Sequence, residues 1–565
     1  MPTPHPDRLF PADANTRAIA RELYAGVHHL PLVSPHGHVD PALLADDARL
    51  PDPLALLVTP DHYVTRMLYS QGIPLDRLGV PHRPAPGARG PAAPAPGARG
   101  PNSPASGAQD TDTPGDGGGF DPREAWRTFC AHWYLFRGTP SRLWLEQVLA
   151  DLFEVTEPLS ARTADATYEQ IDAHLKRPEY RPRALFERFG LEVLTTTDSP
   201  LSTLDQHARL AAEGWGTRVI PAFRPDDVVD PQYDGWASNV ARLGELTGED
   251  TATLDGYLSA LRQRRAAFAK AGATSTDHGH PTARTLDLPR EEATRLFDRL
   301  LRAAGTPDGV DGEDAEAFRA YMLVRFAGMS VDDGLVMQLH PGAARNHNRL
   351  LHRRYGRDVG GDVPSRTDYV EALRPLLDRH GDDPRLRLVL FTLDESTYAR
   401  ELAPLAGVYP AVYLGPAWWF FDSPEGMRRY RELTTETAGF YNTVGFTDDT
   451  RAFCSIPTRH DVARRVDCAY LARLVAEHRL PLDEAAQVAA DLAYHLPRQV
   501  YRLDGTPTGS PTTGVQATGS PATGTPTGSP GTGSPAASTT NPTATPTSST
   551  GSTAAPTAPA ATSTA

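Results

Sequence analysis

The chain alternates between short apolar, β-branched runs and longer segments with helical periodicity. An amphipathic helix is predicted, for example, for YVEALRPLLDRHG at 369–381, where apolar residues recur at the spacing of one helix face. Eight of the short runs are predicted to be buried strands, each ending in polar or charged residues: LPLVSPHGHVD (30–40), LEVLTTTDSP (191–200), TRVIPAFRPD (217–226), GATSTDHGH (272–280), LVMQLHPGAARN (335–346), LRLVLFTLDE (386–395), AVYLGPAWWF (411–420) and TVGFTDDTR (443–451). Strands that alternate with helices pair in parallel through right-handed crossovers. Eight such units predict an α/β fold, a (β/α)8 barrel of the TIM type, with its chemistry at the carboxyl ends of the strands.

Two segments of biased composition interrupt this pattern. Residues 81–119 contain PAPGARG twice, and no charged residue occurs after Asp504. Both segments lack the large apolar side chains that would offset the entropy of ordering them, so we predict a disordered internal loop and a disordered tail. The chain is then expected to divide into an N-terminal segment with the first barrel strand (1–40), a mostly helical subdomain inserted after that strand and containing the loop (41–190), the remainder of the barrel (191–504) and the tail (505–565).

Composition excludes several classes of function. A formal charge of −14 argues against sequence-independent nucleic-acid binding, which depends on many cationic contacts to phosphate. The three cysteines are widely spaced and form no CxxC motif, as expected in a reducing compartment. The N-terminus has no apolar signal-peptide core, and no later stretch reaches the roughly 18 apolar residues of a membrane span. We therefore expect a cytoplasmic protein with no nucleic-acid partner and no membrane partner.

Two histidines close the first predicted strand, His36 and His38 in the sequence PHGH. In an extended chain, residues i and i+2 point to the same side, so both imidazoles can face one metal ion. Asp449 ends the last predicted strand, and strands one and eight are neighbours in a closed barrel. An isolated HxH pair is often purely structural, and its position at a strand end is what favours a metal site.

Nine motifs follow one another along the chain at compatible spacing. They are HGHVDP (36–41), DHYVTRMLYSQG (61–72), LFRGTPSRLWL (135–145), TTDSPLSTLDQH (196–207), IPAFRPD (220–226), TDHG (276–279), QLHPGAARNHN (338–348), LGPAWWFFDSPEGMRR (414–429) and TDDTRAFCSIPTRHDVARR (447–465). Together they resemble the uronate (glucuronate) isomerases of the amidohydrolase superfamily, over nearly the whole chain between the N-terminus and the tail. The resemblance implies an enzyme that interconverts aldose and ketose forms of hexuronates: glucuronate with fructuronate, and galacturonate with tagaturonate.

The resemblance also implies roles for individual residues. His36, His38 and Asp449 would be ligands of one divalent metal ion (Zn, Mn or similar), and Asp449 would also be the acid/base group. Tyr63 and Arg451 would contact the substrate around its carbonyl as catalytic residues. Among residues near the other strand ends we expect His340 to be catalytic and four side chains to bind the substrate: Arg224, His278, Arg345 and Trp418. His278 and His340 could equally be pocket histidines with satisfied hydrogen bonds, and Asn348 is a further candidate for lining the pocket.

The chemistry of such a reaction calls for these residue types. An aldose–ketose isomerisation moves a proton between adjacent carbons through an enediolate, so it needs an acid/base group and positive charge beside the oxygens. A divalent ion and the Arg451 guanidinium can supply that charge. The planar fork of arginine also suits the carboxylate of a uronate. The expected partner is therefore a small-molecule hexuronate, and a homo-oligomer is left open.

Two other functions remain open on the sequence alone. One is a mononuclear metal-dependent hydrolase of the same superfamily, acting on an amide or a lactone. Lys176 and Lys270 are the only lysines and neither lies at a predicted strand end, so a two-metal site bridged by a lysine is not expected. The other alternative is a catalytically inert barrel that binds sugar.

Overall fold

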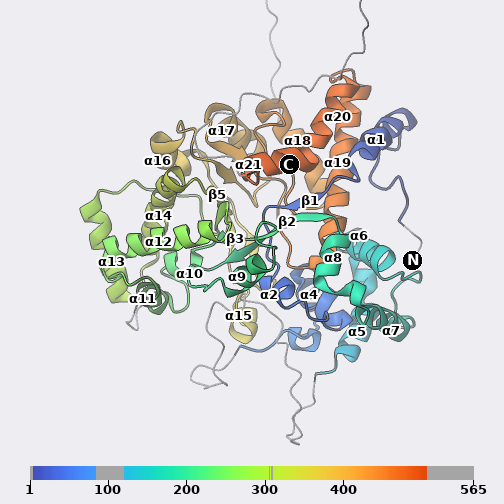
Figure 1. Ribbon diagram of the computed structural model, residues 1–565, viewed down its shortest axis with the longest axis horizontal. Helices are drawn as coiled ribbons and strands as arrows, with labels where there is room; N and C mark the ends of the chain where they lie inside the picture. Colours follow the sequence, from blue (N-terminus) through green and yellow to red (C-terminus); the bar gives the residue numbers. More distant parts are fainter. Residues whose placement is uncertain (1–3, 84–119, 305, 307–308, 505–565) are drawn as a thin grey trace, which may run out of the picture. The chain divides into compact units, whose positions relative to one another are not determined.

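The computed structural model describes residues 4–83, 120–304, 306 and 309–504 (Figure 1). They all belong to one compact unit, Met1–Pro511. Most of the predicted disordered loop and all of the predicted disordered tail lie outside the described residues.

Seven parallel strands form one curled sheet whose spatial order follows the sequence, β1-β2-β3-β4-β5-β8-β9. This arrangement confirms seven of the predicted strands and their parallel pairing, and it is that of a TIM-type barrel that is not fully closed by strands. The strands are β1 (Leu32–Ser34), β2 (Leu191–Asp198), β3 (Val219–Phe223), β4 (Ser275–His278), β5 (Val336–Leu339), β8 (Leu388–Leu390) and β9 (Val412–Leu414).

The eighth predicted strand, at 443–451, is not a strand in the structure. Only one bridge joins it to the sheet, between Leu414 and Thr443. Gly445 (φ 77°) and Asp449 (φ 39°) take left-handed backbone conformations, which interrupt the extended geometry that a ladder requires. The segment nevertheless continues around the barrel, because the N–H of His38 donates to Thr450 O over 3.0 Å and so connects it to the end of β1.

Helices cover the outer face of the sheet between successive strands. They are α9 (Asp205–Ala212), α10 (Asp226–Val229), α11 (Trp236–Thr247), α12 (Leu254–Lys270), α13 (Arg290–Ala303), α14 (Gly312–Asp333), α16 (Val370–His380), α17 (Ala403–Val408) and α18 (Pro424–Ala438). Phe223 of β3 illustrates the packing, with its ring centroid 5.2 Å from that of Phe268 and 6.4 Å from that of Phe326. Between β5 and α16 the chain forms a short antiparallel pair, β6 (Ala343–Ala344) with β7 (Val363–Pro364), around α15 (Arg349–Tyr355).

The chain between β1 and β2 is helical and lies at one side of the barrel (Figure 1). Its helices are α2 (Pro41–Asp46), α3 (Pro53–Leu57), α4 (His62–Tyr69), α5 (Pro122–Ala131), α6 (Pro140–Gln147), α7 (Ala164–Leu175) and α8 (Pro182–Arg188). Four of them start at an Asp-Pro or Thr-Pro pair, in which the first side chain caps the helix and proline occupies the first turn. A separate apolar cluster around Trp126, Phe153 and Phe186 stabilises this part.

Helices from the two ends of the described chain pack against one another. They are α1 (Ala14–Val27), α19 (Ile456–Ala476), α20 (Leu482–Ala490) and α21 (Leu496–Val500). Directly after α21, the fully buried Tyr501 donates from its hydroxyl to Gln338 Oε1 over 2.8 Å. Arg502 donates to Gly334 O, just before β5, and Arg387, just before β8, donates to Val500 O. Residues 500–502 therefore lie at the amino ends of these strands, and the mouth, where the strands have their carboxyl ends, is at the opposite end.

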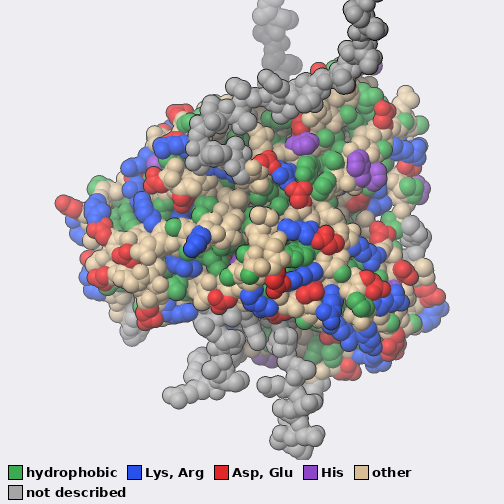
Figure 2. Space-filling model, viewed as in Figure 1, with side chains coloured by type: hydrophobic (Ala, Val, Ile, Leu, Met, Phe, Trp, Pro, Cys, Tyr) green, Lys and Arg blue, Asp and Glu red, His purple; other side chains and the backbone are tan. Residues whose placement is uncertain are grey.

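Acidic and basic side chains are interspersed over the face seen in Figure 2. Ion pairs at the surface include Arg209 with Asp46 and Arg299 with Asp314. Among the helices of the described residues, none is both long and apolar enough to cross a membrane.

Candidate active site

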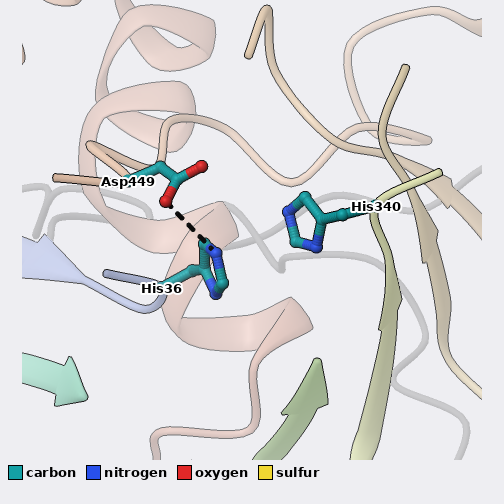
Figure 3. A group of neighbouring side chains, drawn as sticks. All are labelled: His36, His340 and Asp449. Atoms are coloured by element: carbon teal, nitrogen blue, oxygen red, sulfur yellow. Dashed lines mark ion pairs between the residues drawn. The ribbon is translucent and has the colours of Figure 1, made fainter. Parts of the chain in front are cut away.

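Three side chains able to bind a metal converge at the barrel mouth. His36 follows β1, His340 follows β5, and Asp449 lies in the segment that replaces the eighth strand. One ligand atom of each lies within 4.8 Å of those of the other two, and in Figure 3 the three side chains point toward one another. The rings of His36 and His340 are stacked, with centroids 4.6 Å apart.

Asp277, on β4, sets the protonation of His340. Burial opposes its charge, yet Arg224 and His340 hold the pKa of the Asp277 carboxyl well below its usual range, so it is an acceptor only. Its Oδ1 lies 2.7 Å from His340 Nδ1, which must therefore carry the proton. The other ring nitrogen, Nε2, is left with a lone pair.

Asp449 contacts both histidines of the PHGH sequence. Its Oδ1 lies 3.4 Å from His36 Nε2 and 3.0 Å from His38 Nε2. Burial opposes its charge, but the two imidazoles hold the pKa of Asp449 well below its usual range, whereas burial lowers the pKa of His38 to about 4. The left-handed conformation costs Asp449 on the order of 1 kcal/mol, and such strain is often found at functional sites. His38 thus contacts the same carboxylate as His36. The three residues whose ligand atoms all lie within 4.8 Å of one another are, however, His36, His340 and Asp449, without His38.

The donor set fits a divalent cation. Among the described residues, the buried Nε2 of His340 has no hydrogen-bond partner, although its lone pair is free to accept one. Leaving a buried acceptor unpaired costs free energy that a bound cation would remove. Two imidazole nitrogens and one carboxylate are ligands that Zn, Mn, Co and Fe all accept.

Arg224 lies at the mouth after β3, held by two carboxylates. Its Nη1 donates to Asp277 Oδ2 and its Nε to Asp226 Oδ2, each over 2.9 Å. Burial opposes the charge, but Asp277 and Asp226 raise the pKa of Arg224, so it stays cationic. Gly279 packs directly against this arrangement, where a Cβ would collide with the guanidinium. The side chain is 24% exposed, so one face remains open to a ligand.

Further cations lie around the carboxylate of Asp358, in the chain between α15 and β7. Arg345 contacts it at 3.2 Å and also contacts Asp362 at 3.1 Å. Burial opposes the negative charge of Asp358, but Arg345, Arg451 and Arg224 lower the pKa of its carboxyl. Within the described part of the chain, the guanidinium of Arg451 makes no hydrogen bond or ion pair, so its donors are available to a ligand.

Aromatic rings line the mouth beside these charges. The buried Trp418 lies edge-on to His340, with centroids 4.6 Å apart, and Trp419 is stacked on His62 at 5.2 Å. Burial, followed by the charges of Arg451 and Arg345, lowers the pKa of His62 to about 3, so this imidazole is neutral. Tyr63 is its neighbour at the start of α4, where Asp61 caps the helix by accepting from the Tyr63 N–H.

Two of the residues expected to bind the substrate or line the pocket do not lie with the other side chains of the mouth. His278 follows Asp277 on β4 and therefore points to the opposite face of the sheet, where its ring lies 4.7 Å from Phe326 of α14. Its Nε2 is hydrogen-bonded to Thr276 Oγ1 at 3.0 Å. Asn348 caps α15 by accepting from the N–H groups of Leu350 and Leu351.

Three residues of the mouth were not singled out from the sequence, namely Asp277, His62 and Asp358. Asp277 and His62 lie within the TDHG and DHY motifs, immediately beside His278 and Tyr63. Alternation along β4 would have identified Asp277 if the inward face of the strand had been known. Asp358 lies in an irregular segment, and no sequence pattern predicts that it approaches Arg345.

Comparison with known proteins gives a consistent family assignment. The profile of the family described as glucuronate isomerase matches residues 105–501. A uronate isomerase of Rhizorhabdus wittichii is 59% identical over 499 residues, covering 88% of this chain and 98% of the relative. The crystal structure of glucuronate isomerase from Caulobacter crescentus is similar with a TM-score of 0.80 at 53% identity, covering 90% of this chain and 99% of that one. That of a uronate isomerase from Thermotoga maritima has a TM-score of 0.75 at 26% identity, covering 88% and 98%. The chain therefore belongs to the glucuronate isomerase family of aldose–ketose isomerases, as its motifs predict.

Proposed function

We propose that the protein interconverts glucuronate with fructuronate and galacturonate with tagaturonate by proton transfer through an enediolate at the barrel mouth. The observation that carries this proposal is the convergence of His36, His340 and Asp449 next to open arginine donors. An enediolate needs a proton acceptor and nearby positive charge, and both are present in this arrangement.

Asp449 is the proposed proton acceptor. Its carboxylate lies against His36 and His38, and these imidazoles hold its pKa well below the usual range, so it is in the ionised form that a proton acceptor requires. We propose His36, His340 and Asp449 as the ligands of one divalent ion, with His38 supporting the carboxylate. When bound, such an ion would supply positive charge beside the oxygens of the substrate.

The arginines are proposed to bind the anionic parts of the substrate. Arg451 has uncommitted donors and would stabilise the developing negative charge on the enediolate oxygens. Arg224 and Arg345, held in place by carboxylates, would bind the fixed carboxylate or the hydroxyls. Trp418 would cover this region and limit the access of water.

The segment 41–190 is proposed to be a helical subdomain that carries His62 and Tyr63 to the mouth. We also propose a cytoplasmic location, in keeping with three cysteines that are all buried and unpaired. Assembly into a homo-oligomer is compatible with this arrangement.

The Asp449→Asn variant tests the proposal. It keeps the shape of the side chain but removes the proton acceptor, so turnover of glucuronate should fall by at least about 100-fold, in keeping with the usual contribution of a general base. The same preparation should be assayed with sugar lactones. Full isomerase activity in Asp449→Asn would overturn the assignment, and lactone hydrolysis without isomerisation by the wild type would favour a mononuclear hydrolase.

A further inference from the structure

The hydroxyl of Tyr63 is held from two sides by residues 415–423, which follow β9 and are called here the β9 loop. It donates a hydrogen bond to Asp422 Oδ1 over 2.7 Å, and it accepts one from the backbone N–H of Phe420, also over 2.7 Å. A phenol carries one proton, so the donor of Tyr63 is fully used by Asp422. What remains for another partner is a lone pair on the oxygen.

Arg459, on α19, fixes the carboxylate that receives this proton. Its Nη1 donates to Asp422 Oδ2 over 2.9 Å, and its side chain is only 5% exposed. The guanidinium carbon lies 3.7 Å from the ring centroid of Trp144, on α6. A buried, charge-assisted hydrogen bond and a stacked aromatic ring together restrict rotation of the Asp422 carboxylate. The proton of Tyr63 therefore has a fixed direction.

This network connects parts of the chain that are distant in sequence. Tyr63 and Trp144 come from helices between β1 and β2, whereas Asp422 and Arg459 come from the last quarter of the barrel. The β9 loop also carries Trp418 and Trp419, whose rings pack on His340 and His62. The contact of Asp422 with Tyr63 thus positions one phenol relative to the charged side chains of the mouth.

We propose that Asp422 is a positioning residue: held by Arg459, it takes the proton of Tyr63 and so makes the Tyr63 oxygen an acceptor for a hydroxyl of the substrate. This inference rests on the proposed function, because it assigns Tyr63 a hydrogen bond with the sugar. Burial and the charge of Asp422 also raise the pKa of Tyr63 well above its usual value, so the phenol stays protonated and does not act as the base.

The Asp422→Asn variant reverses this polarity with little change of shape. Arg459 can donate only to the amide oxygen, so the amide nitrogen must face Tyr63 and donate to it. The Tyr63 proton is then released and points elsewhere, and its oxygen has no lone pair left for the substrate. We expect kcat/KM for glucuronate to fall about tenfold or more, the usual range for a lost hydrogen bond to a polar group.

A double-mutant cycle separates this role from general support of the fold. The four proteins are the wild type, Asp422→Asn, Tyr63→Phe and the double variant. If Asp422 acts through the phenol, the substitution costs about tenfold in the wild type and nearly nothing in Tyr63→Phe. An equal loss in both backgrounds would overturn the proposal. The pH profile of kcat should keep its shape in Asp422→Asn, since no titrating catalytic group is removed; a shifted profile would also contradict the role.

The chain offers a closely matched control. Asp467 pairs with Arg431 at 2.6 Å, with side chains 14% and 4% exposed, against 14% and 5% for Asp422 and Arg459. Asp467→Asn should lower the melting temperature to a similar extent and leave kcat/KM unchanged. If Asp422→Asn does not fold, Arg459→Lys replaces it in the cycle, because lysine keeps the charge but loses the planar fork that orients the carboxylate.

Failure of the proposed function would be recognised separately. A wild-type protein with no turnover of either uronate would refute that function. For each of the four proteins of the cycle, we would then measure how much glucuronate raises the melting temperature. Coupling between positions 422 and 63 in that shift would still support the inference, and its absence would refute it.

Discussion

Replacement of Asp277 by asparagine should convert His340 from a ligand into a non-ligand without removing its side chain. In the wild type, one carboxylate oxygen accepts from His340 Nδ1 at 2.7 Å and the other accepts from Arg224 at 2.9 Å. An asparagine must keep its oxygen toward Arg224, which can only donate. Its amide group then donates to Nδ1 of His340, and the proton of that ring moves to Nε2.

The size of the effect follows from the loss of one ligand lone pair. Hydrogen-bonding partners that orient metal-binding histidines typically contribute about 10- to 100-fold in metal affinity. We expect Asp277→Asn to weaken binding of a divalent ion by that factor. Activity should fall more than affinity, because the change also removes a charge that holds Arg224.

The measurement is a titration of Zn or Mn against a competing chelator, followed by assays of glucuronate turnover at saturating metal. Asp226→Asn is the control, because Asp226 pairs with the same arginine at 2.9 Å but does not contact His340. It should raise KM and leave metal affinity unchanged. If Asp277→Asn binds metal as tightly as the wild type, Asp277 does not determine which nitrogen of His340 carries the proton.

Two further predictions concern the surroundings of the mouth. Gly279→Ala places a Cβ against the Arg224 guanidinium and should raise KM for uronates several-fold with a smaller effect on kcat; steady-state kinetics would measure this, and an unchanged KM would contradict a substrate-binding role for Arg224. His207→Asn should make the free energy of unfolding fall more steeply than in the wild type as the pH rises from 4 to 7. Burial raises the pKa of Asp198 from 3.8 to about 7 and lowers that of His207 from 6.5 to about 4, so the folded and unfolded states of this pair bind nearly equal numbers of protons at each pH. In the wild type, His207 takes up a proton in the unfolded state, but not in the folded state, as the pH falls from 7 to 4, and this lowers the free energy of unfolding. The variant has no histidine at this position and so lacks this loss of stability. Relative to the wild type, the free energy of unfolding of the variant should therefore decline by about 3 kcal/mol as the pH rises from 4 to 7. Denaturant unfolding at several pH values measures this difference, and parallel curves for the two proteins would contradict it.

Much of the fold follows from local sequence patterns. Seven apolar runs ending in polar residues become the seven strands of the sheet, because each is long enough to be buried and is followed by a helix that can cross back over it. The last run fails as a strand for a conformational reason. Gly445 and Asp449 adopt left-handed conformations, and the preference of an aspartate for such a conformation is set by its surroundings rather than by its neighbours in sequence.

The candidate site depends more on the three-dimensional fold than on local sequence patterns. His36 and Asp449 could be paired because the first and last units of a barrel are adjacent. The choice between Asp277 and His278 depends on which face of β4 points inward, and a one-residue error exchanges the two. The network of Tyr63, Asp422 and Arg459 joins segments more than 350 residues apart in the case of Tyr63 and Asp422, so only the folded structure brings it together.

The most direct test of a metal-dependent isomerase centre is turnover of glucuronate and galacturonate by the purified full-length chain, with and without a metal chelator. We expect formation of the corresponding keto acid, loss of that activity on chelation, and recovery on addition of Zn or Mn. Product formation that persists unchanged after complete removal of metal, or no product under any metal condition, would contradict the claim that His36, His340 and Asp449 form the catalytic centre.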